Sequence, residues 1–375
     1  MPGAYRLLVL ASKPMGMSPS QRYRLEQWAP YLEADHGLTL DFAPFESPRF
    51  ASLLAQPGRT ATKALFVFRD YLRRASVLER SRHYDAVVIH REAALVGPAI
   101  YERLLARTGI PLIYDFDDAI WSASQAMPHG SLSRLHCFAK TSTICRIADA
   151  CTAGNSFLAD YAMARNPHTF IVPTSIELSN YPLVPEPSET GKFIVCWTGS
   201  ATTLIHFELA RGALERLAKL VPLVVKVICS RPPDRPIAGA ENRFVPWSAD
   251  GEAEEVGSCH VGIMPLPDDE ISRGKCAMKA LQYMATGRPV IVSPVGANVE
   301  VVSDGVNGFL AATTEDWVDR LLALQASAKL RAKLGLAARQ TIGDKFSAQL
   351  SAARFATAVH SVLRNRAKIA AGTER

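Results

Sequence analysis

Three basic side chains and a glycine lie close together in one short stretch of the sequence. Arg273, Gly274 and Lys275 occupy a charged loop, and Lys279 follows one helical turn later, with Gln282 on the same helix face. Unpaired amide groups at a helix start, a glycine that lets the backbone approach a ligand, and nearby cations together make a site for a phosphate or diphosphate. We therefore expect a phosphate site here. The alternative is a solvated loop followed by an ordinary amphipathic helix.

Two apolar strands and a helix must position these residues. Residues 261–266 and 289–293 are apolar runs, and residues 276–286 between them have a helical pattern. Gly287 stands where a left-handed helix end favours glycine, and Pro289 follows where a helix cannot continue. A helix that crosses between two such strands is the unit of a parallel sheet, and its first loop lies at the carboxyl edge, where ligands bind.

A second strand-to-helix turn has groups suited to phosphate. Residues 193–197 have a strand pattern, and Gly199 and Ser200 follow it with further hydroxyls. A glycine and hydroxyls at such a turn can donate hydrogen bonds to phosphate through backbone and side chain. Arg231, at the end of the next predicted strand, is a further candidate cation.

The sequence around Lys279 is similar to a known family. Lys279, QYMATGRPV at residues 282–290 and DGVNGFL at residues 304–310 resemble the donor-binding segment of GT-B glycosyltransferases, specifically the retaining family-4 type (glycosyl transferases group 1). The resemblance is strong over residues 194–346. It implies an α/β fold with two Rossmann-like domains that face a central cleft. It also implies transfer of a sugar, with retention of configuration, from a nucleotide-diphosphate sugar to a glycan or lipid-linked acceptor, without a cofactor or metal.

The resemblance also implies roles for single residues. Arg273 and Lys279 are expected to stabilise the leaving phosphate, which itself can accept the acceptor's proton, and Asp117 and Asp118 stand where relatives have a His-Asp pair. The expected donor-binding residues are Gly199, Ser200, Arg231, Val245, Trp247, Gly274, Lys275 and Gln282. Trp247 can stack on the nucleotide base, or it can be a core tryptophan. The family's two glutamates are replaced by Gly274 and Gln282, and Gln282 can still hydrogen-bond a ribose hydroxyl whereas Gly274 cannot replace a carboxylate.

Length and composition fit an enzyme of two domains. The chain has 375 residues, 48% of them hydrophobic, which can supply two cores. We expect domains at 1–185 and 186–346, joined by the proline-rich run 182–189, and a helix at 347–375 that returns to the first domain. The sequence has no apolar run long enough for a membrane span and no visible secretory signal. The odd count of 7 cysteines, without a CxxC pair, favours a cytoplasmic protein with reduced thiols and argues against a zinc site.

Residues 49–82 are strongly basic. They contain eight arginines and lysines against Asp70 and Glu79, with apolar residues at spacings of three and four. A basic amphipathic helix suits an anionic membrane surface, which would place the protein peripherally at the inner membrane face. Nucleic acid is not expected, because no recognition motif accompanies the charge. The alternative is a solvated helix that packs on the first domain.

Acidic residues follow a predicted strand in the first half of the chain. Residues 110–114 lead directly into Asp115, Asp117 and Asp118. Asp115 and Asp117 can be the DxD pair that holds a divalent metal in GT-A glycosyltransferases. Alternatively, these residues face the cleft of a GT-B enzyme, contact donor or acceptor sugar and bind no metal, with His90 as the nearest polar substitute for the missing family histidine. The family resemblance favours the second alternative.

The first loop of the chain is the expected acceptor side. Gly16 lies in the loop after the first predicted strand, and Arg22 and Arg24 lie near the start of the following helix. By the parallel-sheet rule this loop should face the cleft, so that both arginines can reach an anion; otherwise they are surface arginines. Two other functions remain open, namely an epimerase or phosphorylase of the same architecture and a catalytically silent nucleotide-sugar-binding subunit.

Overall fold

The chain folds into two compact units, each built on its own sheet. The computed structural model describes residues 4–54, 58–122, 137–187, 191–370 and 372. One unit comprises Met1–Thr174 and Ala348–Arg375, and the other comprises Ser175–Ser347. Residues 175–185, which we expected in the first domain, pack with the second unit, since the Tyr181 hydroxyl donates to Glu252 at 2.8 Å.

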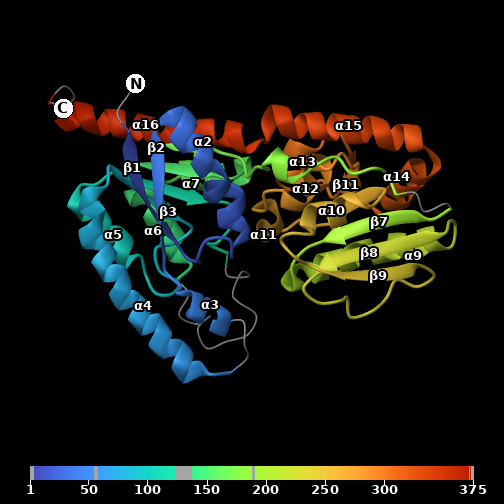
Figure 1. The fold of residues 1–375 in the computed structure, drawn as a ribbon, viewed down its shortest axis with the longest axis horizontal. Helices are drawn as coiled ribbons and strands as arrows, with labels where there is room; N and C mark the ends of the chain where they lie inside the picture. Colours follow the sequence, from blue (N-terminus) through green and yellow to red (C-terminus); the bar gives the residue numbers. More distant parts are fainter. Residues whose placement is uncertain (1–3, 55–57, 123–136, 188–190, 371, 373–375) are drawn as a thin grey trace. The chain divides into compact units, whose positions relative to one another are not determined.

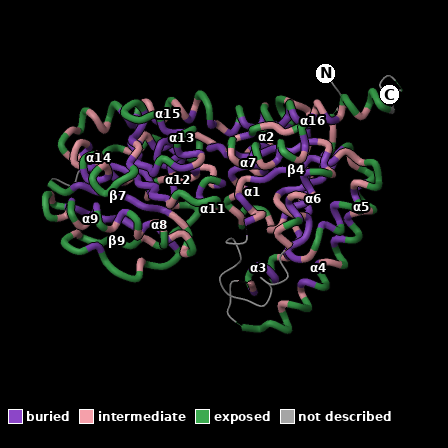
Figure 2. The backbone as a smooth tube through the Cα atoms, turned by 180° about the vertical axis from the view of Figure 1, so that it is seen from behind, coloured by how far each residue is buried: buried purple, intermediate pink, exposed green. Residues whose placement is uncertain are grey.

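The first unit contains a six-stranded parallel sheet in the order β2-β1-β3-β4-β5-β6 (Figure 1). Its strands are β1 (Tyr5–Ala11), β2 (Leu38–Pro44), β3 (Ala86–His90), β4 (Leu112–Phe116), β5 (Ala150–Ala153) and β6 (Thr169–Ile171). β3, β4 and β5 are buried along their whole length (Figure 2), because helices cover both faces of a parallel sheet. The helices are α1 (Pro19–Gln21), the π-helix at Arg22–Glu26, α2 (Gln27–His36), α3 (Pro48–Leu54), α4 (Thr60–Arg80), α5 (Ile100–Thr108), α6 (Ala139–Ile147), α7 (Ser156–Met163) and α16 (Ala348–Ala370).

The last helix of the chain, α16, packs in the first unit against α2. The rings of Trp28 and Phe355 lie 5.6 Å apart, and both belong to one buried core with residues of β1 and β3. Because α16 contributes Ala352 and Val359 to that core as well, the C-terminal helix is part of the first domain's hydrophobic interior.

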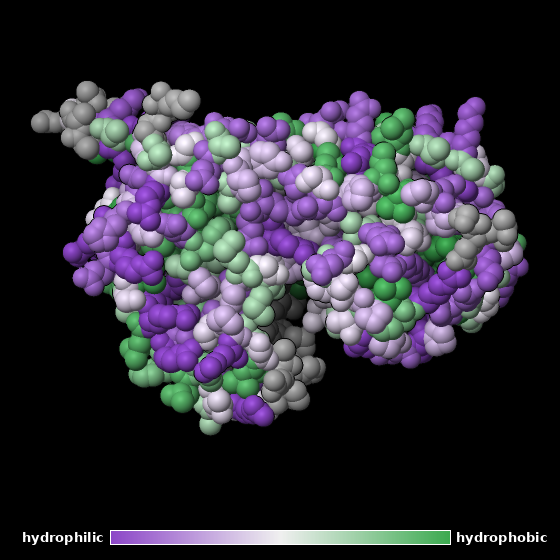
Figure 3. Space-filling model, in the orientation of Figure 1, coloured by the Kyte–Doolittle hydropathy of each residue, from purple (hydrophilic) through white to green (hydrophobic). Residues whose placement is uncertain are grey.

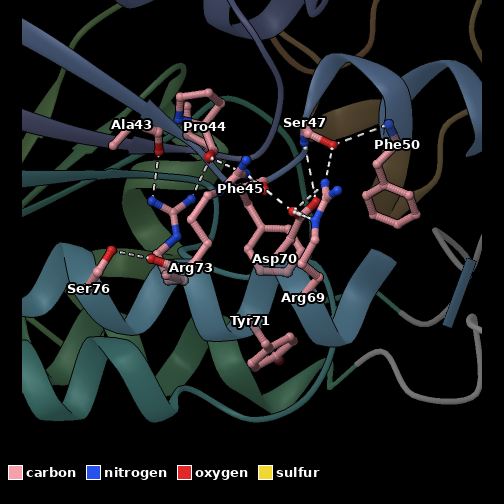
Figure 4. A network of polar contacts seen from close by, with 12 residues as sticks. Ala43, Pro44, Phe45, Ser47, Phe50, Arg69, Asp70, Tyr71, Arg73 and Ser76 are labelled. Carbon is pink, nitrogen blue, oxygen red and sulfur yellow. Dashed lines mark hydrogen bonds and ion pairs between the residues drawn. The ribbon is translucent and has the colours of Figure 1, made fainter. Parts of the chain in front are cut away.

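The basic segment forms α3 and α4, and its arginines are partly used within the unit. Arg69 donates to Ser47 at 2.7 Å, and Arg73 donates to the backbone carbonyls of Pro44, the last residue of β2, and of Phe45 (Figure 4). Arg74 is buried and donates to the Ala43 carbonyl at 2.7 Å. Arg73 and Arg74 therefore hold α4 against β2 and the residue that follows it, and Arg69 holds α4 to Ser47.

A row of apolar side chains remains exposed on α4. Leu65, Phe68 and Leu72 are 65%, 62% and 60% exposed, and their spacings of three and four place them on one helix face. Figure 3 shows strongly hydrophilic and hydrophobic residues side by side over the part of the first unit where α4 lies. No helix in the described part of the chain is long and apolar enough to cross a membrane.

The second unit contains another six-stranded parallel sheet, in the order β12-β11-β10-β7-β8-β9. Its strands are β7 (Phe193–Thr198), β8 (Leu223–Cys229), β9 (Glu241–Pro246), β10 (Val261–Met264), β11 (Val290–Val292) and β12 (Phe309–Leu310). Its helices are α8 (Leu204–Phe207), α9 (Arg211–Ala218), α10 (Glu252–Gly257), α11 (Glu270–Arg273), α12 (Met278–Ala285), α13 (Asn298–Val301), α14 (Thr314–Ala326) and α15 (Ala328–Lys345). The predicted α/β fold class is therefore confirmed, with one parallel sheet in each unit.

Two glycines let α12 pack closely on its neighbours. A Cβ atom at Gly262 of β10 would lie 2.1 Å from the Tyr283 ring, so only glycine lets this ring lie flat on the strand. The Tyr283 hydroxyl then donates to the Cys196 carbonyl of β7 at 3.0 Å. At the other end of α12, a Cβ atom at Gly335 of α15 would lie 2.0 Å from the Gly287 carbonyl oxygen. These contacts fix the position of α12 over the sheet.

Candidate functional site

The ends of β7 and β10 bring two predicted phosphate-binding segments together. These strands are parallel neighbours, so the Gly199 turn after β7 and the loop that leads from β10 to α12 leave the same edge of the sheet. A Cβ atom at Gly199 would lie 2.8 Å from Lys279 Cε. Lys279 Nζ lies 5.5 Å from the centre of the buried Trp197 ring. The structure therefore places the Lys279 side chain directly against the Gly199 backbone.

Three basic side chains of this unit affect one another electrostatically. Burial, and then the charge of Lys275, lower the pKa of Lys279 to about 7. Burial, and then the charges of Lys275 and Lys279, lower the pKa of His206 to about 4. The Nδ1 atom of His206 is buried and has no hydrogen-bond partner in the structure as described. We call Lys275, Lys279 and His206 the basic cluster; an anion bound beside it would favour the charged form of Lys279.

The start of α12 is also strained. Ala277, the N-cap residue, has a left-handed backbone with φ 54°, a conformation that costs a residue with a side chain about 1–2 kcal/mol. Strain of this kind is commonly kept at ligand sites. Ala277 lies between Lys275 and Lys279 in the sequence.

The other predicted cations pair with nearby acids. Arg273 makes a two-pronged ion pair with Asp268, with Nε to Oδ1 at 2.7 Å, and Arg231 pairs with Asp234 at 2.6 Å. Gly274 is buried at the end of α11, and Ser200 is exposed, its hydroxyl 2.9 Å from that of Thr202. Arg273 and Arg231 are thus held by ion pairs with Asp268 and Asp234, and we do not count them in the basic cluster.

Gln282 and Trp247 meet at a carboxylate that the sequence did not single out. The buried Glu252 of α10 accepts from the Gln282 amide, from the Tyr181 hydroxyl at 2.8 Å and from Trp247 Nε1 at 3.0 Å. Trp247 is 41% exposed and follows β9, which also holds the partly buried Val245. The expected base-binding tryptophan and the residue at the family's glutamate position therefore lie in one hydrogen-bonded network with an acid from another helix. The only sequence signal was an acidic helix start at residues 252–255.

In the first unit, Asp115 is an internal ion-pair partner. Both its oxygens accept from the guanidinium of Arg24, at 2.5 and 3.0 Å, and further contacts come from His90 Nδ1 at 2.8 Å and the Thr152 hydroxyl at 2.7 Å. Burial alone would raise the pKa of Asp115, but Arg24 and His90 outweigh it and hold that pKa well below its usual range. Arg24 is 0% exposed, so it does not extend to a ligand as we expected.

Asp117, Asp118, Gly16 and Arg22 lie nearer the surface. Asp117 accepts from the Ser20 hydroxyl at 2.5 Å, and Asp118 lies 3.6 Å from Arg91. The Gly16 amide, in a left-handed turn, donates to the Glu26 carboxylate, and Arg22 donates to the Tyr23 hydroxyl at 2.8 Å.

The geometry does not favour Asp115 and Asp117 as a metal-binding pair. The oxygens of Asp115 already face Arg24, His90 and Thr152, and a guanidinium repels a cation. Across the part of the chain that the structure describes, histidine, cysteine and carboxylate side chains form no group of three that could hold a metal ion.

Comparisons with known proteins agree with the fold. Residues 212–327 match the family model described as glycosyl transferases group 1. Among solved structures, Anabaena HepE in complex with UDP and glucose is 16% identical with a TM-score of 0.68, over 95% of this chain and 100% of that chain. Sucrose-phosphate synthase from Thermosynechococcus elongatus is 12% identical with a TM-score of 0.66, over 96% and 100%. The lipopolysaccharide outer core galactosyltransferase WaaB is 14% identical with a TM-score of 0.62, over 95% and 99%. No curated protein sequence matches the chain.

Proposed function

We propose that this protein is a glycosyltransferase that moves a sugar from a nucleotide-diphosphate sugar to a glycan or lipid-linked acceptor. The observation that carries the proposal is the basic cluster beside Gly199, at the carboxyl edge of the second sheet. Lys275 and Lys279 lie within the part of the chain that matches the group 1 model. A diphosphate there would offset the mutual repulsion of the cluster and accept hydrogen bonds from the Gly199 turn.

The chemistry requires charge stabilisation at the leaving group. As the bond between the sugar and the diphosphate breaks, negative charge grows on the phosphate, and a cation already held there stabilises the transition state more than the ground state. Lys279 fits this role because it is partly buried, where electrostatic interactions are strong. Arg273 is the second candidate, once it turns from Asp268 to the phosphate. We propose that the reaction proceeds with retention and without a metal or cofactor.

The nucleoside end of the donor is proposed to lie at the Glu252 network. Trp247 is 41% exposed and donates to the buried Glu252, which also accepts from Gln282, and an aromatic ring of this kind suits stacking on a base. Glu252 supplies a carboxylate close to Gln282, the position where the family has glutamate. HepE was solved with UDP and glucose, so we choose UDP-glucose as the first donor to test.

The acceptor is proposed to be presented at an anionic membrane surface, in polysaccharide biosynthesis on the cytoplasmic side. The exposed row of Leu65, Phe68 and Leu72 on α4, with the exposed Arg59, Arg80 and Arg82 of the basic segment, supports peripheral binding. All seven cysteines are free thiols, which supports a reducing compartment.

A panel of nucleotide-diphosphate sugars tests the proposal. A donor at a hundred times its dissociation constant should stabilise the second unit by about 2.7 kcal/mol, seen as a higher melting temperature. Sugar transfer to glycan and lipid-linked acceptors is then measured with and without chelator. Transfer that survives chelation supports a metal-free enzyme. Strict metal dependence refutes the proposal that transfer needs no metal. Stabilisation without turnover points to a silent binding subunit.

Lys279→Met should lower turnover by about two to three orders of magnitude, as loss of a group that stabilises a developing anion does. Lys329→Met is the matched control, because Lys329 is an exposed lysine on α15. Equal turnover of the two variants would remove Lys279 from the mechanism.

A further inference from the structure

The first unit has a pocket at the amino edge of its sheet, the edge opposite Asp117. The pocket has a volume of about 590 Å³, and it lies between the C-terminal part of α16 and the chain around the starts of β5 and β6. Small-molecule sites usually have volumes of about 300–1,000 Å³. All the residues that line the pocket belong to the first unit, so the pocket is separate from the proposed donor site in the second.

An ion pair at the pocket leaves part of an arginine available to a ligand. Arg366 Nε donates to Asp149 Oδ1 at 2.9 Å, and Arg366 Nη2 lies 2.6 Å from the same oxygen. A guanidinium has five N–H donors, so the edge formed by Nη1 and Nη2 still has donors for a second acid. The Arg366 side chain is 39% exposed, which lets a ligand reach that edge.

Three further polar side chains line the pocket. His168 and Asn365 are exposed and Ser361 is partly exposed, and none of these side chains has a hydrogen-bond partner among the described residues. Imidazole, amide and hydroxyl groups can each donate a hydrogen bond. Because His168 precedes β6 whereas Ser361 and Asn365 belong to α16, donors surround the space from two elements.

The charge around the pocket favours an anion. Helix α16 contains Arg354, Arg364, Arg366 and Lys368 and has no acidic residue. Among the residues that line the pocket, Asp149 alone is acidic, and both its oxygens already accept hydrogen bonds, one from Arg366 and the other from a backbone amide at 2.8 Å. A concave site bordered by cations of this kind attracts anions.

The pocket also has an apolar side. Val362, Arg366 and Ile369 line it from α16, with spacings of four and three that place them on one helix face. Val362 is buried, but Ile369 is 58% exposed, and Phe170 of β6 is partly buried. A ligand with an apolar body would remove more of Ile369 and Phe170 from water, which is favourable.

We propose that this pocket binds a small amphiphilic organic anion. Its carboxylate or phosphate head pairs with the free edge of Arg366, since both groups match the fork of a guanidinium. Its apolar body covers Ile369 and Phe170. This binding site goes beyond the proposed function, because neither the sugar donor nor its transfer is needed to fill it.

Octanoate and octyl phosphate are the test ligands, since each joins an anionic head to an apolar body. Calorimetry on the full chain should show one saturable site, and octanol, which lacks the charge, should bind about 10- to 100-fold more weakly. NMR of protein labelled at the isoleucine methyl groups should show the Ile369 signal shifting with saturation. An Ile369 signal that does not move, or octanol that binds as tightly as octanoate, would overturn the site.

Two variants separate the head from the body of the ligand. Arg366→Gln should weaken octanoate binding about 10- to 100-fold and leave octanol binding unchanged. Ile369→Ser, at an exposed position, should weaken both about fivefold, because part of an isoleucine surface is no longer buried by the ligand; it also assigns the NMR signal.

Arg364→Gln is the matched control for charge and should bind as wild type. Arg364 is an exposed arginine of the same helix and does not line the pocket. Equal losses of octanoate affinity in Arg364→Gln and Arg366→Gln would mean that the general charge of α16 attracts the anion, and would overturn the site. Unchanged affinity for both ligands in Ile369→Ser would also overturn it.

Discussion

The pKa of Lys279 makes a prediction about how donor binding depends on pH. In the free protein, burial and the charge of Lys275 lower this pKa to about 7. A bound diphosphate favours the charged ammonium and so raises the pKa again. Above neutral pH, donor binding must therefore be accompanied by uptake of a proton, and the affinity must weaken as pH rises.

The size of the effect follows from linkage. With a free pKa of about 7, about nine tenths of Lys279 is neutral at about pH 8, so binding there takes up about 0.9 proton. The dissociation constant should be about tenfold higher at about pH 8 than at about pH 6, and about a hundredfold higher at about pH 9. At high pH, where binding takes up one full proton, the binding free energy should weaken by at most about 1.4 kcal/mol for each pH unit. Below neutral pH the affinity should be nearly constant until His206 begins to gain a proton.

Calorimetry with UDP-glucose measures the dissociation constant and the number of protons taken up on binding. The proton uptake follows from the heat of binding in buffers of different ionisation enthalpy. The phosphates of a nucleotide sugar do not titrate in this range, so the protein supplies the pH dependence. Lys279→Arg is the informative variant, because a guanidinium stays charged throughout and should bind with little pH dependence. A wild-type affinity that is flat from neutral to alkaline pH, or a slope that persists in Lys279→Arg, would refute the reasoning.

Three further predictions concern stability and can be checked by urea unfolding. Gly335→Ala should destabilise the protein by about 1–3 kcal/mol, because the new Cβ would meet the Gly287 carbonyl oxygen at 2.0 Å; a neutral result would mean that α15 can move away. Gly212→Ala, which has no atom within 4 Å of its new Cβ, should instead stabilise by about 0.5–1 kcal/mol, the helix preference for alanine, and a loss there would contradict the packing. Asp115→Asn should cost about 3–5 kcal/mol, because it leaves the charge of Arg24 buried; wild-type stability would show that Arg24 finds another acceptor.

The sheets could be predicted from the sequence because their strands are continuous apolar runs. β3, β7 and β10 are buried along their whole length. A strand of a parallel sheet is covered on both faces, so its sequence is a continuous apolar run that is easy to recognise. The glycine at the end of α12 was likewise visible, because a left-handed helix end favours glycine, whereas the left-handed backbone at Ala277 had no sequence signal. The position of residues 175–185 was not visible, because it depends on Tyr181 reaching Glu252, far away in the sequence.

The candidate site was predictable only where one local segment contains it. Lys275 and Lys279 lie on one loop and helix, whereas the partners of Arg24, Gln282 and Asp117 come from other elements. An arginine near a helix start looks the same in sequence whether it faces solvent or a buried aspartate. Long-range pairing of this kind decided that Arg24 is internal, and it brought Ser20 to Asp117 and Glu252 to Gln282.

A crystal structure of the protein with a bound nucleotide-diphosphate sugar would test the central claim most directly. We predict that the diphosphate oxygens lie within hydrogen-bonding distance of Lys279 Nζ and the amides of the Gly199 turn. A diphosphate bound at any other place in the molecule, or held through a metal ion at Asp117, would contradict the account.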